Sequence, residues 1–380
     1  MLLQGIFPPI TTPFYPDGNV YFKKIEHNVE RYSRTPVAGI VVLGSTGEAV
    51  MLSDQERRDV LKSARESAAP NKVLIAGAGI ESAIETLRLT EYAAELGYDV
   101  ALIRTPHFYR KQMQPANLLA FYRTVADRSP LPVMIYNVPP FTAYDIPAEL
   151  VIELAGHPNI VAIKESSGDV EKVRRMVEGT RHIQRSATVT ETFEAVTPRM
   201  LAVAASGAGV HGAAAELVQV GTLAGNEERS SPLAKARNMS SYDQASSSSK
   251  PSSAAVTVVG NLKTRHKEVG FQVLVGAAHK LHPSVEAGAV GAILAFACPA
   301  PTACYEIYAA WKEGDADLAS LKQERISIAA QRVGSELGIS ALKHAMDFNG
   351  YYGGTARLPL LPLTAEAKAE VERLMTDIRN

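Results

Sequence analysis

Several features are scarce in this chain of 380 residues, and each scarcity excludes a class of protein. There are two cysteines, Cys298 and Cys304, which are too few for a disulfide framework and are not spaced like zinc ligands. Neither sign of charge is in excess, because 39 Lys and Arg residues face 40 Asp and Glu residues. This balance does not favour a protein that binds nucleic acid or a membrane surface.

Long hydrophobic runs are missing as well. No apolar stretch approaches the length of a membrane span. The first residues, MLLQGIFPPITTPF, lack the basic start and the long apolar core of a signal peptide. Together these features predict a soluble, cytoplasmic protein with no membrane or nucleic-acid partner.

Short apolar runs alternate with amphipathic helical patterns along most of the chain. The eight runs predicted to be strands are Gly5–Thr12, Gly39–Gly44, Lys72–Gly79, Asp99–Pro106, Pro132–Pro139, Ile160–Gly168, Phe271–Gly276 and Ala289–Ala297. Such alternation is typical of a parallel sheet, and eight units predict a closed (β/α)8 TIM barrel. A doubly wound open sheet is the alternative, which the lack of a phosphate-binding glycine turn after the first strand disfavours.

The predicted strands divide the chain into four segments. Residues 1–184 hold barrel strands one to six, residues 271–313 hold strands seven and eight, and residues 314–380 are predicted to form a C-terminal helical region. Between them, residues 185–270 form an insert whose serine-rich part, 226–253, cannot bury enough apolar surface to order itself. We therefore predict a partly disordered insert on the amino-terminal face of the barrel, away from the chemistry.

The stretch from Ile160 to Asp169, IVAIKESSGD, is the most informative part of the sequence. Its β-branched start predicts a strand that is buried on both faces, and Lys164 ends the apolar run. A lysine in such a strand is costly unless its charge is paired or its pKa is lowered. Because barrel enzymes carry catalytic groups at the carboxyl ends of strands, Lys164 is a candidate Schiff-base amine. A lysine that snorkels to the rim is the alternative.

Polar side chains end three other predicted strands. The turn Gly44–Glu48, GSTGE, offers converging backbone amides and hydroxyls that suit a small carboxylate, although an ordinary strand–helix turn is the alternative. Tyr109 in TPHFY follows strand four, and Tyr136 in YNVP ends strand five. Two such tyrosines can relay protons if they lie within hydrogen-bond reach, whereas buried tyrosines are often core aromatics.

A glycine pattern at 207–212, GAGVHG, matches the dinucleotide-binding fingerprint G-x-G-x-x-G. That fingerprint requires a second strand and an acidic residue further along the chain. The serine-rich tract follows instead, so a nicotinamide-binding role is disfavoured.

The strand ends together resemble the dihydrodipicolinate synthase / N-acetylneuraminate lyase family of pyruvate-dependent class I aldolases. The motifs that carry the resemblance are PPITTPF, GSTGE, TPHFY, YNVP, IKESSGD, FQVLVGA and GAVGAILA, which span nearly the whole chain outside the insert. The resemblance implies a (β/α)8 barrel with a C-terminal helical domain and a homo-oligomer, either a dimer or a tetramer. It also implies that no metal or diffusible cofactor is needed.

The resemblance further implies roles for individual residues. Lys164 would form an imine with the keto carbon of pyruvate or another 2-oxo acid, and Tyr136 would move protons at that imine. Thr46 and Tyr109 match the partners of this tyrosine in a proton relay, with Tyr109 usually lent by a neighbouring subunit. These four residues are the expected catalytic group.

The resemblance also implies which residues bind pyruvate. Ser45 and Thr46 match the pocket that holds its carboxylate, where the family often has two threonines. Ile293 matches a residue of strand eight whose backbone faces pyruvate. These three residues are the expected binding group.

One departure from the family pattern concerns the second substrate. Dihydrodipicolinate synthases typically carry an arginine two residues after the proline of YNVP, where it holds the carboxylate of aspartate semialdehyde, and Phe141 stands at that place. The tail, GISALKHAMDFNGYYGG followed by LPL, resembles 4-hydroxy-2-oxoglutarate aldolases. We therefore predict a lyase that cleaves 4-hydroxy-2-oxoglutarate or a related 2-oxo acid to pyruvate and a small aldehyde. The alternatives are the condensation of pyruvate with aspartate semialdehyde and, in another class, a non-catalytic binding barrel.

Overall fold

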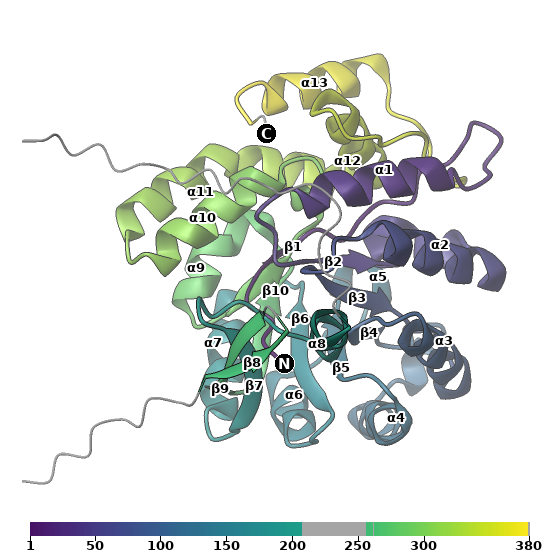
Figure 1. Ribbon diagram of the computed structural model, residues 1–380. Coiled ribbons are helices and arrows are strands. Elements are labelled where there is room, and N and C mark those ends of the chain that lie inside the picture. Colours follow the sequence, from purple (N-terminus) through teal and green to yellow (C-terminus); the bar gives the residue numbers. More distant parts are fainter. Residues whose placement is uncertain (207–255, 261, 379–380) are drawn as a thin grey trace, which may run out of the picture.

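Eight parallel strands form the centre of the protein, which the computed structural model describes for residues 1–206, 256–260 and 262–378 (Figure 1). Around the sheet, the strands lie in the order β1 (Gly5–Phe7), β11 (Gly291–Ile293), β10 (Gln272–Val275), β6 (Ile160–Glu165), β5 (Val133–Asn137), β4 (Val100–Arg104), β3 (Val73–Gly77) and β2 (Gly39–Val42). The two outer strands meet where Pro9 bridges Val41 and the amide of Ile10 donates to the Val41 carbonyl at 2.9 Å. The sheet therefore closes into the predicted barrel, and the doubly wound alternative is wrong.

A helix follows each barrel strand and covers the outside of the barrel. These helices are α1 (Phe22–Ser33), α2 (Asp54–Ser67), α3 (Ala83–Glu95), α4 (Pro115–Arg128), α6 (Ala148–Ala155), α7 (Val170–Thr180), α9 (Leu281–Glu286) and α10 (Pro301–Lys312). Local sequence sets their starts, as in α2, where the Ser53 side chain accepts from the Glu56 amide and the Glu56 carboxylate accepts from the Ser53 amide. A short helix, α5 (Pro139–Thr142), also follows β5.

Alternation along the strands decides which side chains face the barrel interior. In β2, Val41 belongs to the cluster inside the barrel, whereas Ile40 and Val42 pack between the strands and the helices. In β6, Ala162 belongs to the inner cluster. Successive inward residues of a strand are two apart, so Lys164 also points into the barrel.

The chain between α7 and β10 departs from the simple barrel pattern. Its described parts form β7 (Arg185–Thr190), α8 (Pro198–Ala205), β8 (Thr257–Val259) and β9 (Leu262–Val269), and the three strands pair as an antiparallel sheet in the order β7–β9–β8. Strand pairing was not predicted at either end of the insert. The serine-rich part, 226–253, and the glycine pattern at 207–212 lie outside the described residues.

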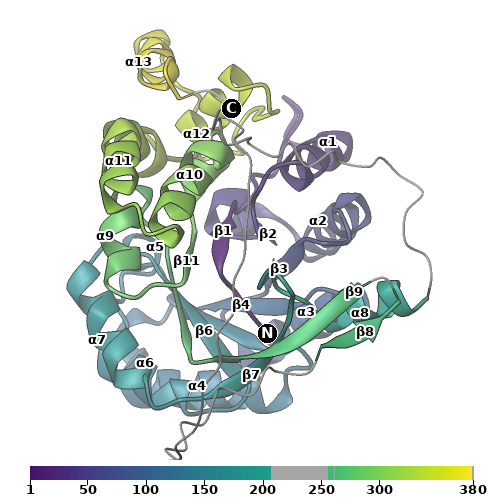
Figure 2. The ribbon, with the colours of Figure 1, turned by 60° about the vertical axis from the view of Figure 1, so that its left-hand side comes forward.

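This small sheet and α8 lie at the amino-terminal end of the barrel (Figure 2). Val196 and Met200 join the cluster that fills the barrel interior. Nearby, Nη2 of Arg199 lies 3.1 Å from Oδ2 of Asp99, the residue that precedes β4. Lys164 stands at the opposite, carboxyl-terminal end of its strand, so the described flanks of the insert lie away from it.

Three further helices follow the barrel. They are α11 (Ala316–Gln331), α12 (Gly338–Phe348) and α13 (Ala365–Met375), with a π-helical turn, Arg332–Glu336, between the first two. They form the C-terminal helical region that the sequence predicts. In Figure 1, α12 and α13 lie above α1. No helix in the described ranges combines the length and the apolar character that a membrane span requires.

Candidate active site

Lys164 and Tyr136 meet inside the barrel at the carboxyl ends of two paired strands. They are register partners in β5 and β6, so strand pairing itself brings the amine and the phenol together. Lys164 is 3% exposed, and its Nζ lies 4.1 Å from the centroid of the Tyr136 ring. Two other buried lysines, Lys172 and Lys343, form ion pairs with carboxylates, whereas Lys164 forms none with a described residue. Within the described ranges, no carboxylate is therefore paired with this amine.

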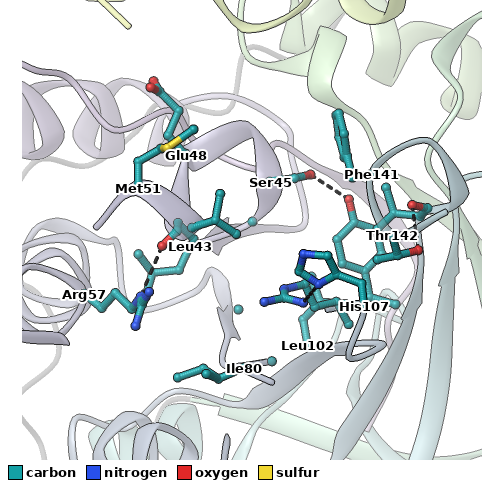
Figure 3. A pocket seen from close by; sticks show the side chains of 18 of the residues that line it. Leu43, Ser45, Glu48, Met51, Arg57, Ile80, Leu102, His107, Phe141 and Thr142 are labelled. Atoms are coloured by element: carbon teal, nitrogen blue, oxygen red, sulfur yellow. Dashed lines mark hydrogen bonds between the residues drawn. The ribbon is translucent and has the colours of Figure 1, made fainter. Parts of the chain in front are cut away.

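The Tyr136 hydroxyl contacts the turn that follows β2. Ser45 Oγ lies 2.8 Å from that hydroxyl oxygen, and Figure 3 shows the Ser45 side chain at the wall of a cavity. Thr46, the predicted relay partner, is buried beside Ser45 at 4% exposed. Ser45 and Thr46 lie in a 3-10 turn, Ser45–Gly47, where neighbouring side chains point in different directions, so one hydroxyl faces the phenol.

Tyr109 lies on the surface of the single chain. It is 67% exposed, and its ring packs edge-on against Phe108, which is 76% exposed, with 5.2 Å between the ring centroids. The structure therefore does not bring Tyr109 to Tyr136 within one chain.

Ile293 ends β11 at the same end of the barrel as the lysine. It is fully buried in the interior cluster and is the register partner of Phe7 in β1. β10 separates its strand from β6. Ile293 thus contributes to the barrel wall at the level where the strands end.

The residues that directly follow the site lysine and the site tyrosine form a buried polar network that the sequence analysis missed. Asn137 Nδ2 donates to both carboxylate oxygens of Glu165 at 2.9 Å. Lys172 Nζ, on α7, lies 3.2 Å from Glu165 Oε2 and also contacts Asp145. This network ties the ends of β5 and β6 together from outside the barrel, which fixes the two inward-facing residues relative to one another. The sequence does contain a signal for this network, because Asn137 and Glu165 are polar residues at outward positions of two otherwise apolar strands.

Two buried hydroxyls at this end of the barrel have no hydrogen-bond partner among the described residues. They are Thr105 Oγ1, directly after β4, and Ser166 Oγ, two residues after Lys164. Gly276 packs against the serine so closely that a Cβ there would lie 2.0 Å from its Oγ. A buried hydroxyl without a partner costs about 1–3 kcal/mol, and a polar substrate would remove that cost. Neither residue carries a role predicted from the sequence.

A cavity of about 340 Å³ opens beside Ser45 and Tyr136. Its wall is largely apolar and includes Phe141, which is 63% exposed and occupies the place where the family pattern has an arginine. The cavity is therefore continuous with the tyrosine end of the site and has an aromatic side chain at its mouth.

The basic side chains that line this cavity in the described chain come from α2, β4 and the loop after β4. Arg57 Nε donates to the Ala49 carbonyl at 3.1 Å, and burial lowers the pKa of Arg57. Arg104 Nη1 lies 2.9 Å from Glu81 Oε1, and His107 Nδ1 lies 2.6 Å from the same oxygen. Figure 3 shows Arg57 and His107 on different sides of the cavity. No cluster of three or more metal-ligating side chains occurs in the part of the chain that the structure describes.

The model of the dihydrodipicolinate synthetase family matches residues 2–222 and 233–378. The chain belongs to this family. Members of the family are lyases of the aldolase type, so the predicted enzyme class, a class I carbon–carbon lyase that uses pyruvate, is confirmed.

Two curated relatives are both named 4-hydroxy-tetrahydrodipicolinate synthase. The 4-hydroxy-tetrahydrodipicolinate synthase of Methanoculleus marisnigri is 37% identical over 240 residues, which cover 62% of this chain and 80% of the relative. The enzyme of the same name from Xanthomonas axonopodis pv. citri is 41% identical over 177 residues, which cover 47% of this chain and 58% of the relative. These names support the alternative prediction, the condensation of pyruvate with aspartate semialdehyde, better than the cleavage of 4-hydroxy-2-oxoglutarate.

Solved structures of family members share the fold. The dihydrodipicolinate synthase of Thermotoga maritima has a TM-score of 0.72 and 20% identity, and the match covers 99% of each chain. YagE from E. coli K12, a family member solved in complex with pyruvate, has a TM-score of 0.71 and 22% identity, and the match covers 100% of this chain and 99% of YagE. At such identities the likeness supports the barrel architecture and not a particular substrate.

Proposed function

We propose that the protein is a Schiff-base lyase in which Lys164 forms an imine with pyruvate. The observation that carries the proposal is the buried Lys164 Nζ, 4.1 Å from the centroid of the Tyr136 ring, whose hydroxyl in turn lies 2.8 Å from Ser45 Oγ. An amine, a phenol and a hydroxyl that lie next to one another supply a nucleophile and a path for protons at one end of the barrel.

The chemistry follows from the imine. The amine attacks the keto carbon of pyruvate, water leaves, and the resulting iminium draws electrons from the methyl carbon. Loss of a methyl proton gives an enamine, whose carbon adds to the carbonyl carbon of an aldehyde while the new alkoxide takes up a proton. Water then hydrolyses the imine, and the same steps in reverse cleave the bond. Because the imine itself is the electron sink, the proposal includes no metal and no diffusible cofactor.

The surrounding side chains receive roles that fit their positions. Tyr136 moves the protons, with the Ser45 hydroxyl as its neighbour. The 44–48 turn, residues Gly44–Glu48, which contains Thr46, binds the pyruvate carboxylate through its hydroxyls and backbone amides. Ile293, on β11, forms part of the barrel wall at the same end. The Ser166 hydroxyl, which has no hydrogen-bond partner among the described residues, donates a hydrogen bond to an oxygen of the bound substrate.

We also propose that the working form is a homo-oligomer. Tyr109 and Phe108 stand out from the surface after β4, and Phe141 and Val50 are exposed beside the cavity. A second copy that covers this apolar edge would bring its own Tyr109 towards the site. The expected assembly is a dimer or a tetramer.

For the second substrate, the first candidate is aspartate semialdehyde, because the curated relatives are named 4-hydroxy-tetrahydrodipicolinate synthase. The second candidate is the cleavage of 4-hydroxy-2-oxoglutarate to pyruvate and glyoxylate. The observation that favours this second candidate is Phe141, which stands in the cavity wall where the synthases carry a carboxylate-binding arginine.

Steady-state kinetics with each second substrate tests the proposal. The purified protein is given pyruvate with aspartate semialdehyde in one assay and 4-hydroxy-2-oxoglutarate alone in another, with the Lys164→Ala variant as the control. We expect turnover with one of the two and none with the variant. Equal turnover by Lys164→Ala would refute the Schiff-base proposal.

A further inference from the structure

Lys343, in the C-terminal helix α12, is fully buried and reaches the carboxyl end of the barrel. Its Nζ donates to the carbonyl oxygens of Thr12 at 2.8 Å and Thr355 at 2.7 Å. It also lies 2.5 Å from Glu48 Oε1. The ammonium therefore donates two hydrogen bonds to backbone carbonyls and pairs with one carboxylate oxygen, which offsets part of the cost of burying its charge.

Glu48 is the last residue of the 44–48 turn and is 2% exposed. Besides the ammonium, it binds the backbone of the C-terminal region, because its Oε2 accepts from the Arg357 amide at 2.8 Å. On the barrel side of the same turn, Thr12 Oγ1 donates to the Gly47 carbonyl at 2.6 Å. The turn is thus held by groups that are far away in the sequence.

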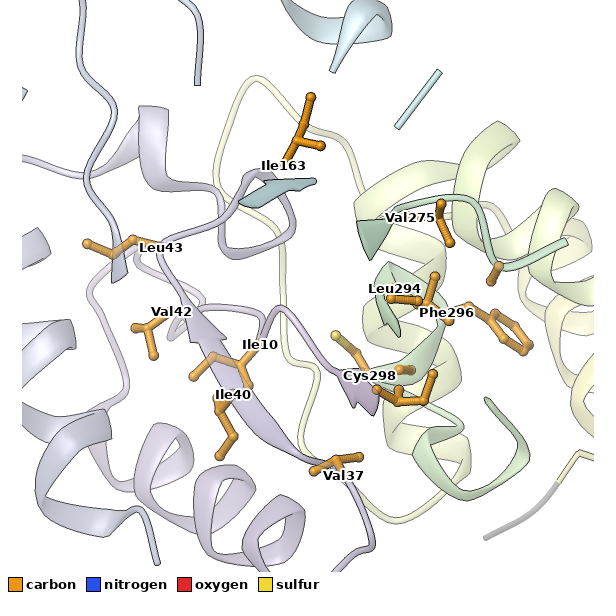
Figure 4. Packing of buried hydrophobic residues seen from close by; sticks show 14 of the residues in the cluster. Ile10, Val37, Ile40, Val42, Leu43, Ile163, Val275, Leu294, Phe296 and Cys298 are labelled. Carbon is orange, nitrogen blue, oxygen red and sulfur yellow. The ribbon is translucent and has the colours of Figure 1, made fainter. Parts of the chain in front are cut away.

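The backbone of the turn shows why it needs such support. Glu48 has φ of 53°, and Leu43, directly before the turn, has φ of 62°. Both are non-glycine residues in the left-handed region, where the Cβ of an L-residue lies too close to the following carbonyl oxygen. Leu43 is anchored by packing in the hydrophobic cluster shown in Figure 4. Glu48 is anchored by charge, and a strained conformation persists only where its surroundings hold it.

A contact that served only to stabilise the fold would not need two buried charges. Taking two charges out of water carries a large desolvation cost, and an apolar pair of similar size is often as stable. Burial lowers the pKa of Lys343, which reflects that cost. The charged pair, in contrast to an apolar one, fixes the direction of the Glu48 side chain and with it the backbone of the turn.

We propose that Lys343 is a positioning residue, which through Glu48 holds the 44–48 turn in the conformation that binds the pyruvate carboxylate and points Ser45 at Tyr136. The inference rests on the proposed function of this site. Lys343 itself is not among the residues that line the cavity, whereas Glu48 and Ser45 are. The C-terminal helical region therefore supports the pyruvate-binding turn through Lys343, which lies outside the cavity.

Two variants separate a positioning role from a role in stability alone. Lys343→Met leaves Glu48 buried without a counter-ion, which should lower the melting temperature. Adding Glu48→Gln to it removes the stranded charge and should restore much of that stability. The matched control is Arg332→Gln, which breaks the ion pair between Arg332 Nε and Glu370 Oε1, 2.7 Å apart, elsewhere in the C-terminal region.

The readout is the rate at which borohydride traps a ketone on Lys164, compared between pyruvate and hydroxyacetone, which has a hydroxymethyl group in place of the carboxylate. We expect the preference for pyruvate to fall by about tenfold or more in both Lys343 variants, roughly the worth of one hydrogen bond to a charged group. The control should keep the preference of the unmodified protein.

Two results would overturn the inference in distinguishable ways. If the double variant is stable and keeps the full preference for pyruvate, Lys343 only stabilises the fold and the proposed function stands. If the unmodified protein traps no pyruvate on Lys164, the proposed function itself fails and the inference fails with it.

Discussion

Removing the Ser45 hydroxyl tests which side chain of the 44–48 turn serves Tyr136. In Ser45→Ala, the Tyr136 hydroxyl loses the oxygen that lies 2.8 Å away. A hydrogen bond between neutral groups contributes about 0.5–1.5 kcal/mol, which corresponds to a loss of roughly two- to twelvefold in kcat. If Ser45 also holds the pyruvate carboxylate, a bond to a charged group worth about 1.5–3 kcal/mol is lost as well. That second loss should raise KM for pyruvate by roughly ten- to a hundredfold.

A double-mutant cycle isolates the part of this effect that passes through Tyr136. Tyr136→Phe alone should slow the reaction by roughly 10²–10⁴. Because Ser45→Ala and Tyr136→Phe remove the same contact, their losses in kcat should not add, and the coupling should be about 0.5–1.5 kcal/mol. Thr46→Val is the matched control, because it removes the neighbouring hydroxyl with little change of shape and should show no coupling to Tyr136→Phe.

The opposite pattern would refute the reasoning. Losses for Ser45→Ala and Tyr136→Phe that add within about 0.5 kcal/mol, together with coupling between Thr46→Val and Tyr136→Phe, would make Thr46 the relay partner. Steady-state kcat and kcat/KM for pyruvate, measured for the single and double variants, decide between the two.

Three further predictions follow from the geometry. Lys164→Ala should abolish turnover but keep the circular dichroism spectrum and melting curve of a folded barrel; a folded and active variant would contradict the imine. Phe141→Arg should raise kcat/KM for aspartate semialdehyde by roughly tenfold or more, because it restores a charged partner for a carboxylate; an unchanged value would show that the cavity binds this substrate in another way. Hydrogen bonding to Arg357, whose Nη2 lies 2.7 Å from Glu56 Oε1, lowers the pKa of Glu56 from 4.5 to about 2. That ion pair should therefore stabilise the fold above pH 4.5 and be lost as the pH falls towards 2, so in Glu56→Gln the free energy of unfolding should depend less on pH across that interval.

The barrel could be predicted because its signals are local. Each strand carries its own apolar run, and each following helix carries its own periodic pattern, so the order β–α–β is readable without knowledge of the pairing. The meeting of Lys164 and Tyr136 followed from the same reasoning, because carboxyl ends of parallel strands meet at one end of the barrel.

The pairing of β7 with β9 could not be read in this way. In β7, Ala187 and Val189 are buried while their neighbours are less so, but serine and threonine dilute this short alternation. The partner strand begins at Leu262, far along the chain. A weak strand signal whose partner is distant resembles a loop.

The contacts of the 44–48 turn were also beyond sequence reasoning. Which of Ser45 and Thr46 faces Tyr136 depends on the backbone angles of the turn, and no residue type announces the left-handed conformations of Leu43 and Glu48. The ion pair with Lys343 joins opposite ends of the chain. Such contacts arise from tertiary packing and have no local signature.

Borohydride trapping with pyruvate, followed by peptide mass mapping, tests the central claim most directly. The structure offers several buried lysines, and Lys72, Lys172 and Lys343 are the comparison for Lys164 within the same sample. We expect a single reduced pyruvate adduct, on Lys164. No adduct on the folded protein, or an adduct on one of the other buried lysines in its place, would contradict it.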